Sequence, residues 1–174
     1  TVQTIPPVTE MTTAELDELI EALQEARVIR SEREAPPEWH GEILRQREAA
    51  LKNGTDRFIS LEEVEKRFAN EFDENQEFTE SAFSDIDTGY WFYEDQREGL
   101  ETYFESSIMA DSGLYKFTPE IHAGVHQIHF GKYFRKVARR FPWSIYYQMD
   151  GDVIRIYAVI DDRRDPSWIS DQLN

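Results

Sequence analysis

The stretch that decides the fold is FPWSIYYQMDGDVIRIYAVIDD, residues 141–162. It consists of two runs of β-branched and aromatic residues, and Asp150-Gly151 lies between them. An Asp-Gly pair in that position is the strongest short-range signal for a β-hairpin, because both residues accept the positive φ angles of a tight turn. The sequence therefore predicts an antiparallel hairpin near its C-terminal end.

Upstream of this hairpin the apolar residues follow a helical period instead. Thr79 is placed to cap a helix, and Gly113 is placed to end a second one. The two apolar stripes are Phe83, Ile86, Tyr90 and Tyr93, then Leu100, Phe104 and Ile108. We expect a helical hairpin or one bent helix here. The fold class predicted for this part is α+β, with helices on one face of an antiparallel sheet.

The first part of the chain has the pattern of three amphipathic helices. Thr12 with Glu15, and Ser60 with Glu63, are capping boxes, while Pro36-Pro37 opens the middle helix and Asn53-Gly54 ends it. About 70 residues with so few large apolar groups make a marginal domain, so we expect these helices to pack on something else. The predicted packing residues are Leu16, Leu19, Ile20, Leu23, Trp39, Ile43, Leu44, Leu61, Val64 and Phe68.

Charge is distributed unevenly along the 174 residues. The formal net charge is -16, yet residues 132–164 hold eight Lys and Arg against four Asp, which is +4 and leaves -20 for the remainder. The basic patch consists of Lys132, Arg135, Lys136, Arg139, Arg140, Arg155, Arg163 and Arg164. Repulsion from the rest of the chain opposes nucleic-acid binding by this patch. An acidic partner, within the same chain or outside it, is the competing interpretation.

Composition limits the other function classes. The chain has no cysteine, no apolar run near the roughly 20 residues of a membrane span, and no signal-peptide pattern at its start. We therefore expect a soluble, cytoplasmic protein without membrane contact. We find no phosphate loop, dinucleotide fingerprint or DNA-binding motif, and we expect no cofactor. His122, His126 and His129 do not have a zinc-ligand pattern, so no metal is predicted.

Two parts of the sequence resemble known families. Residues 76–174 resemble the RelE/ParE superfamily of bacterial toxins, through the hairpin stretch above and the preceding SAFSDIDTGYWFYEDQREGL. Residues 36–68, PPEWHGEILRQREAALKNGTDRFISLEEVEKRF, resemble the small helical antitoxins called addiction-module components. Such antitoxins lie upstream of such toxins in their operons, so the order fits an antitoxin joined to its toxin.

This resemblance implies an organisation and a function. The implied parts are a tail at 1–10, a three-helix antitoxin segment at 11–70, a linker at 71–76, and a toxin domain at 77–174 with two N-terminal helices on a sheet that the family opens with an apolar strand. The antitoxin helices would wrap the toxin, in cis or swapped in a homodimer, and their carboxylates would neutralise its basic patch. The free toxin would act on DNA gyrase, as ParE-like members do.

An enzymatic alternative remains. Ribonucleases of the superfamily hold RNA phosphate with a basic cluster, which makes Arg135, Lys136, Arg139 and Arg163 the candidate catalytic residues of a metal-independent endoribonuclease acting on ribosome-bound mRNA. The arginine that these ribonucleases place in the aromatic strand falls at Ser144, and their C-terminal tyrosine falls close to Trp168 and Ile169. These replacements favour a ParE-like toxin that is not an enzyme. A third hypothesis is an interaction module without toxicity.

Overall fold

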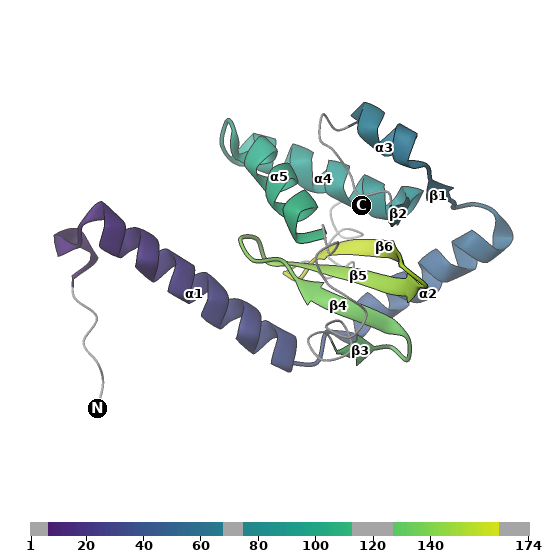
Figure 1. The fold of residues 1–174 in the computed structure, drawn as a ribbon, viewed down its shortest axis with the longest axis horizontal. Coiled ribbons are helices and arrows are strands. Elements are labelled where there is room, and N and C mark those ends of the chain that lie inside the picture. The colour runs from purple at the N-terminus through teal and green to yellow at the C-terminus, as the bar shows by residue number, and fades with distance from the viewer. Residues whose placement is uncertain (1–6, 68–74, 113–126, 164–174) are drawn as a thin grey trace, which may run out of the picture.

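The computed structural model describes residues 7–67, 75–112 and 127–163 (Figure 1). The described chain is a mixed α+β structure in which most helices precede most strands. One sheet lies at its centre, with helices on both faces and a long helix projecting from one side (Figure 1). The predicted α+β class is confirmed.

The sheet has six strands in the order β1-β2-β6-β5-β4-β3. Their bounds are β1 Phe58–Ile59, β2 Gln76–Thr79, β3 Ile128–His129, β4 Tyr133–Val137, β5 Trp143–Asp150 and β6 Val153–Asp161. β4, β5 and β6 form an antiparallel meander, and Gly151 takes a φ of 60° in the tight turn of the predicted hairpin. β2, however, pairs with β6 in parallel, so the prediction of an antiparallel sheet is wrong at this position. The helices after β2 carry the chain across the sheet, and the meander then returns β6 beside β2 in the same direction.

The predicted helical hairpin is confirmed as α4, Glu80–Gln96, and α5, Leu100–Ser112. The Thr79 side chain accepts a hydrogen bond from the backbone N–H of Ala82 at 3.0 Å, which is the expected cap. Gly99, with a φ of 84°, lies in the break between the two helices. Both helices pack on one face of the sheet and bury Phe83, Ile86, Phe104 and Ile108 against Trp143, Ile145, Tyr147 and Ile156.

Three helices form in the first part of the chain, as predicted. They are α1 Thr13–Arg33, α2 Glu38–Asn53 and α3 Leu61–Arg67. The Thr12 capping box is present, Ser60 and Glu63 exchange hydrogen bonds, and Gly54 ends α2 with a φ of 79°. A 3-10 turn, η1 Val8–Glu10, lies just before α1, within the expected tail.

The first part also contributes a strand, which the sequence analysis missed. β1 pairs antiparallel with β2, with Phe58 opposite Thr79 and Ile59 opposite Phe78. Two residues are too few to show a period of two, so no sequence pattern could reveal this strand. β2 itself begins at Gln76, inside the stretch interpreted as a linker.

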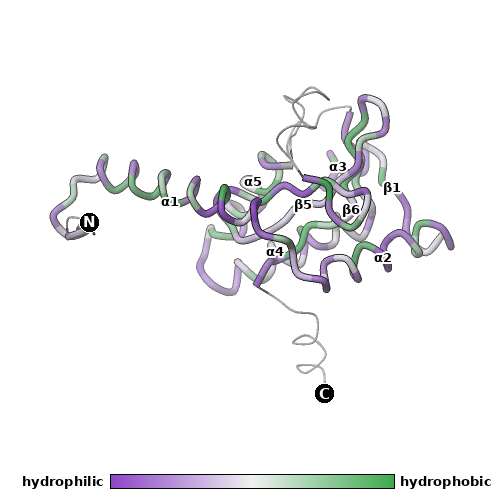
Figure 2. The backbone as a smooth tube through the Cα atoms, turned by 90° about the horizontal axis from the view of Figure 1, so that it is seen from below, coloured by the Kyte–Doolittle hydropathy of each residue, from purple (hydrophilic) through white to green (hydrophobic). Residues whose placement is uncertain are grey.

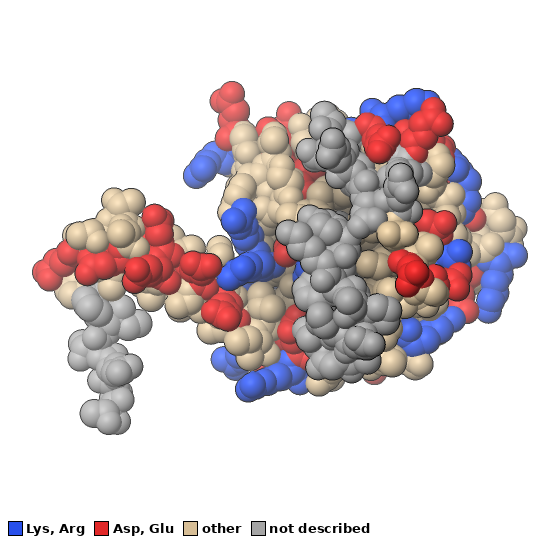
Figure 3. All heavy atoms as spheres, viewed as in Figure 1, with Lys and Arg blue, Asp and Glu red and all other residues tan. Residues whose placement is uncertain are grey.

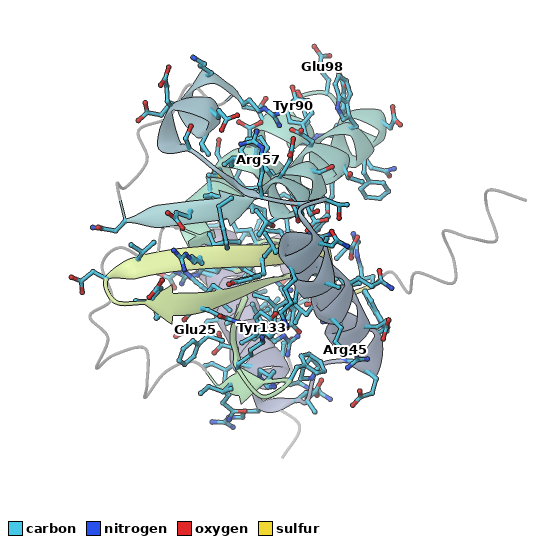
Figure 4. All side chains as sticks on the ribbon, turned by 90° about the vertical axis from the view of Figure 1, so that its right-hand side faces the viewer. Glu25, Arg45, Arg57, Tyr90, Glu98 and Tyr133 are labelled. Atoms are coloured by element: carbon cyan, nitrogen blue, oxygen red, sulfur yellow. The ribbon has the colours of Figure 1, made fainter. Side chains whose placement is uncertain are left out.

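α2 covers the face of the sheet opposite α4 and α5. Leu44 is fully buried there, in a second apolar cluster with Tyr133, Tyr146, Tyr157 and Ile160. Figure 4 shows α2 lying across the sheet, with Tyr133 on the side that faces it and Arg45 on the outer side. α2 therefore completes a second core against side chains of the sheet.

α1 is different, because it contains no buried residue. Its C-terminal end lies against β4, whereas its N-terminal half extends away from the sheet (Figure 2). Ile20 and Leu23, which were predicted to pack, are 51% and 59% exposed. We call residues 8–26 the arm.

Candidate functional site: a buried arginine cluster under the N-terminal helices

Arg135 is the centre of a polar cluster between the first part of the chain and the sheet. It lies in the middle of β4 and is only 5% exposed. Its Nε donates to the Ser144 hydroxyl at 2.9 Å, and its Nη1 donates to the backbone carbonyls of Ser31 at 3.0 Å and Glu34 at 3.3 Å. The last carbonyls of a helix have no partner within the helix. Arg135 therefore caps the C-terminal end of α1 with a buried positive charge.

His40 enters the same cluster from the first turn of α2 and is fully buried. Its Nδ1 lies 2.8 Å from the Tyr146 hydroxyl, and its Nε2 lies 3.8 Å from Oδ1 of Asp162. Burial, with a smaller effect from the charge of Arg135, lowers the pKa of His40 to about 4, so the ring is neutral at pH 7. Because the carboxylate faces Nε2, the tautomer that suits the site carries its proton there and accepts a hydrogen bond from Tyr146 at Nδ1.

Asp162 provides the negative charge of the cluster. It accepts a hydrogen bond from the Ser144 hydroxyl at 2.6 Å and lies 3.7 Å from Nη2 of Arg135. Burial raises its pKa to about 6, against the opposing effects of Ser144 and Arg135. At neutral pH the cluster thus contains a carboxylate and a guanidinium linked through one hydroxyl. Removing either group would leave the other charge buried without a countercharge.

A second arginine makes the reciprocal contact. Arg27, in α1, donates to the backbone carbonyls of Ala138 at 3.1 Å, Arg139 at 2.7 Å and Phe141 at 3.4 Å, in the connection between β4 and β5. Arg135 binds carbonyls of α1, and Arg27 binds carbonyls next to β4. The end of α1 is therefore fixed to the sheet mainly by charged donors and backbone acceptors.

An ion pair with two hydrogen bonds joins the two parts, but its charges are reversed relative to the prediction of acidic helices facing a basic patch. Arg47 of α2 binds both carboxylate oxygens of Asp85 in α4, at 2.7 and 3.0 Å, and the Tyr157 carbonyl at 3.1 Å. Asp85 also accepts from the backbone N–H of Val159 at 2.9 Å. In this pair the first part of the chain supplies the positive charge and the sheet domain supplies the negative charge.

The structure separates the four candidate catalytic residues. Arg135 is in the cluster, whereas Lys136, the next residue of β4, has its side chain on the other face and donates to the Asp111 carbonyl of α5. Arg139 is exposed beside Glu21 of the arm at 3.3 Å. Arg163 binds Asp161 and the Tyr93 hydroxyl.

The other members of the basic patch also have separate partners, and Figure 3 shows Lys and Arg at several places on the face in view. Lys132 pairs with Glu48 of α2. Arg155 pairs with Glu77 and Asp150, both outside the first part of the chain. Arg140 lies over the ring of Tyr103, and Arg164 is outside the described residues. Only some of the patch faces the acidic helices.

The predicted packing residues divide into three groups. Leu44 and Val64 are buried, and Trp39 and Ile43 pack on the second cluster. Leu16 and Leu19 are half-buried, while Ile20 and Leu23 are exposed. The side chains of Leu61 and Phe68 are not among those that the structure describes.

Several residues of the site had no recognisable signal in the sequence. Tyr146 and Asp162 are each more than 100 residues from His40 in the sequence. A lone histidine in a helix is usually a packing residue. Their association depends on where α2 lies on the sheet. Arg27 and Asp85 were missed for the same reason.

In the described structure, α1 and the start of α2 cover the cluster. A pocket of about 190 Å³ beside it is lined by Ile29, Glu32, Arg33, Gln127, His129 and the edge of Arg135. If α1 and the start of α2 left the sheet, a guanidinium and two hydroxyls, of Ser144 and Tyr146, would be uncovered together. In the described state Nη1 of Arg135 and the Tyr146 hydroxyl are bound to the first part of the chain, whereas the Ser144 hydroxyl donates to Asp162 of the sheet domain.

Comparison with known proteins identifies the first part of the chain only. The family model described as "Putative addiction module component", which is antitoxin-like, matches residues 10–64. No curated protein and no solved structure matches the chain. Residues 10–64 are thus similar to an addiction-module component, and this similarity points to a toxin–antitoxin system with a toxin as partner.

Two further findings bear on the expectations from composition. Among the described helices, none combines the length and hydropathy of a membrane span. Within residues 7–67, 75–112 and 127–163, no three His, Asp or Glu side chains are grouped as metal ligands, and His122 and His126 lie outside these ranges.

Proposed function

We propose that this chain is a self-neutralised toxin–antitoxin protein, in which residues 11–70 are the antitoxin segment and residues 77–174 a RelE/ParE-like toxin domain. The observation that carries the proposal is the position of the antitoxin-like stretch. Carbonyls at the end of its α1 accept hydrogen bonds from Nη1 of Arg135, and its His40 lies between Tyr146 and Asp162. The segment thus occludes a buried charged site of the sheet domain.

The topology of the second part supports the toxin assignment. Among the described residues from Gln76 onward the order is one strand, two helices and a four-stranded antiparallel meander, and the first strand pairs with the last. The family resemblance leads us to expect an opening strand and two helices before the sheet. The arrangement agrees with that expectation, although β2 is short and parallel to its neighbour.

Neutralisation would work at three positions at once. α2 covers one face of the sheet, β1 extends its edge beside β2, and α1 closes over Arg135. Because all three are tethered to the toxin domain, their effective concentration is about millimolar, so even a modest interface stays occupied. In this proposal the carbonyls of α1 and the burial of α2 contribute more than the acidic side chains.

We propose that the released toxin domain acts in the cytoplasm on DNA gyrase, as ParE-like toxins do. The alternative is a metal-independent endoribonuclease that cleaves ribosome-bound mRNA and is held inhibited. One observation favours this alternative: the occluded residue is Arg135, which matches a basic position of the ribonucleases and has two hydroxyls beside it. Ser144, in place of an arginine, argues against it.

Separate expression of the two parts tests the proposal. Residues 71–174 induced alone should arrest bacterial growth, and residues 1–70 supplied from a second promoter should relieve the arrest. Gyrase supercoiling and ribosome-dependent mRNA cleavage, assayed with the same fragment, distinguish the two targets. Soluble, folded 71–174 without any growth effect would support an interaction module and contradict the proposal.

A matched pair of antitoxin variants makes the test specific. Residues 1–70 carrying His40→Ala and Leu44→Ala should fail to relieve the arrest, because both side chains are fully buried against the sheet. Arg45→Ala, on the exposed side of the same helix, should rescue like the natural sequence. Equal rescue by both variants would mean that α2 does not neutralise by binding this face.

A further inference from the structure

The C-terminal end of α1 is attached to the sheet mainly by polar contacts. α1 contains no buried residue, and among the described residues neither apolar cluster includes one of its side chains. Nη2 of Arg27 donates to three backbone carbonyls at 2.7 to 3.4 Å, and Nη1 of Arg135 donates to those of Ser31 and Glu34. Such bonds are exchanged for bonds to water when a helix leaves, so their net contribution is a fraction of their strength. α1 can therefore leave the sheet without exposing either core.

α2 is attached to the same sheet in a different way. Three of its residues are buried, and three more pack on the second apolar cluster. Leu44 is fully buried in that cluster, and Arg47 adds its two hydrogen bonds to Asp85. Water cannot replace the burial of apolar side chains, whose contribution grows with the area removed from water. Undocking α2 would thus open a core, which undocking α1 would not.

The connection between the two helices allows them to move separately. α1 ends at Arg33 and α2 begins at Glu38, and none of the four residues between them is buried. The backbone N–H of Glu34 donates back into α1, while the carbonyl of Pro37 accepts from the first turn of α2. Each of these bonds stays within its own helix. A change of backbone angles between them would turn α1 away without pulling on α2.

The end of α1 covers the outer edge of β4. In the described chain, the pairing of β3 with β4 ends at Phe134, and side chains of α1 lie along the edge beyond it. Glu32 interacts with the backbone N–H of Val137, and Arg27 donates to the carbonyls of Ala138 and Arg139. Such backbone groups need partners, and an edge strand presents them in a row. α1 thus takes the place that a further strand could occupy.

We propose that α1 opens from the sheet as a separate unit while α2 and β1 stay docked, and that this opening frees the outer edge of β4 together with Nη1 of Arg135. Ser144 and Asp162 would keep their hydrogen bond, because both belong to the sheet domain. Elements without buried apolar contacts open at a lower free energy than the core. The inference goes beyond the proposed function, because it holds whether or not the sheet domain is a toxin.

Hydrogen exchange of the full chain, followed residue by residue by NMR, tests the proposal. An undocked α1 would unwind, because a lone helix is marginal in water. Protection factors in residues 28–33 should therefore be at least about tenfold lower than those in the buried part of α2, residues 40–44. Urea up to about 1 M should lower protection in α2 but hardly in residues 28–33, because its effect scales with the surface that an opening exposes.

Three variants show which contacts hold each helix. Arg27→Gln should lower protection in residues 28–33 a further about tenfold and leave α2 unchanged, since charged hydrogen bonds are lost only at α1. Arg30→Gln is the matched control on the same helix, because Arg30 pairs only with the exposed Glu34, and it should change protection by no more than about twofold. Leu44→Ala should lower protection in α2 and leave residues 28–33 almost unchanged.

Two outcomes would overturn the proposal. One is equal protection and equal urea dependence in α1 and α2 of the natural chain, because the two helices would then open as one cooperative unit. The other is an Arg27→Gln chain in which α2 loses as much protection as residues 28–33. Neither measurement depends on growth arrest, so failure here and failure of the proposed function are distinguishable.

Discussion

Arg135 shows how one residue can join two parts of a chain without an ion pair between them. The sequence placed it in a basic patch that should face carboxylates. Its partners from the first part of the chain are instead the carbonyls of Ser31 and Glu34, while its carboxylate, Asp162, comes from its own sheet. Hydrogen bonds from a charged donor are about twice as strong as neutral ones, so these contacts hold α1 effectively.

Replacing this arginine should be costly. Arg135→Met keeps the side-chain volume but leaves Asp162 buried without a countercharge and two helix carbonyls without a donor. We expect a loss of about 3–5 kcal/mol in the free energy of unfolding, measured by urea denaturation. Arg45→Met, which breaks an exposed pair with Glu42, should change it by less than about 1 kcal/mol. Similar small losses for both would show that the cluster is not stabilising.

His40 and Asp162 should give the molecule opposite pH dependences. The pKa of His40 is lowered from 6.5 to about 4, so its contribution to stability is complete above pH 6.5 and is lost as the pH falls toward 4. The pKa of Asp162 is raised from 3.8 to about 6, so its contribution is complete below pH 3.8 and is lost as the pH rises through 6. Each effect is on the order of 3 kcal/mol, and within this window they offset one another.

Single substitutions should separate the two effects. His40→Gln removes the contribution of His40 and leaves that of Asp162. Between pH 4 and 6 the free energy of unfolding should therefore decrease with rising pH relative to the natural chain. Asp162→Asn removes the contribution of Asp162 and leaves that of His40. Between pH 4 and 6.5 the free energy of unfolding should therefore increase with rising pH. Urea unfolding at half-unit pH steps measures both slopes. Two variants whose curves run parallel to that of the natural chain would contradict these pKa shifts.

At the scale of elements, the position of α2 can be tested through one glycine. Gly41 lies in α2, and a Cβ atom there would come within 2.6 Å of the Phe130 ring. In a free helix, Gly→Ala stabilises by about 1 kcal/mol, because alanine has the higher helix propensity. In a helix docked as described, overpacking against Phe130 should reverse the sign and destabilise by about 1–3 kcal/mol.

The sign of this change is the useful readout. Gly41→Ala should have a lower thermal unfolding midpoint than the natural chain. Gln46→Ala, on the exposed side of α2, should change this midpoint very little. A higher midpoint for Gly41→Ala would mean that α2 does not pack on the strands beside Phe130.

At the scale of the whole molecule, the two cores differ in where their residues come from. The first core is built mainly from α4, α5 and the sheet, and among the described residues of the first part of the chain Ile59 and Val64 belong to it. The second core needs Leu44 and Trp39 of α2 against tyrosines of the sheet. The sheet domain therefore has a core of its own, whereas the helices before it have only apolar stripes.

This asymmetry predicts how the fragments behave. Residues 1–70 alone should be largely unfolded or loosely helical, because no part of them can bury its apolar surface without the sheet. Circular dichroism of the fragment should show low helicity and no cooperative melt. A cooperative transition from a stable monomer would show that the first part folds by itself.

The sequence by itself determined the helices and the hairpin. Asp150-Gly151 and the caps at Thr12, Ser60 and Thr79 act through local hydrogen bonds and φ angles, so their effect is visible over a few residues. The resemblance of residues 36–68 to addiction-module components was also readable from the sequence, and the family model matches residues 10–64.

Only the tertiary structure decided which elements meet. β1 is too short to show a pattern, and the parallel pairing of β2 with β6 depends on the whole path of the chain between them. The cluster of Arg135, His40 and Asp162 exists because α1 and α2 settle on the second face of the sheet. Burial and charge at such a site depend on neighbours more than 100 residues apart, and these contacts leave no periodic trace in the sequence.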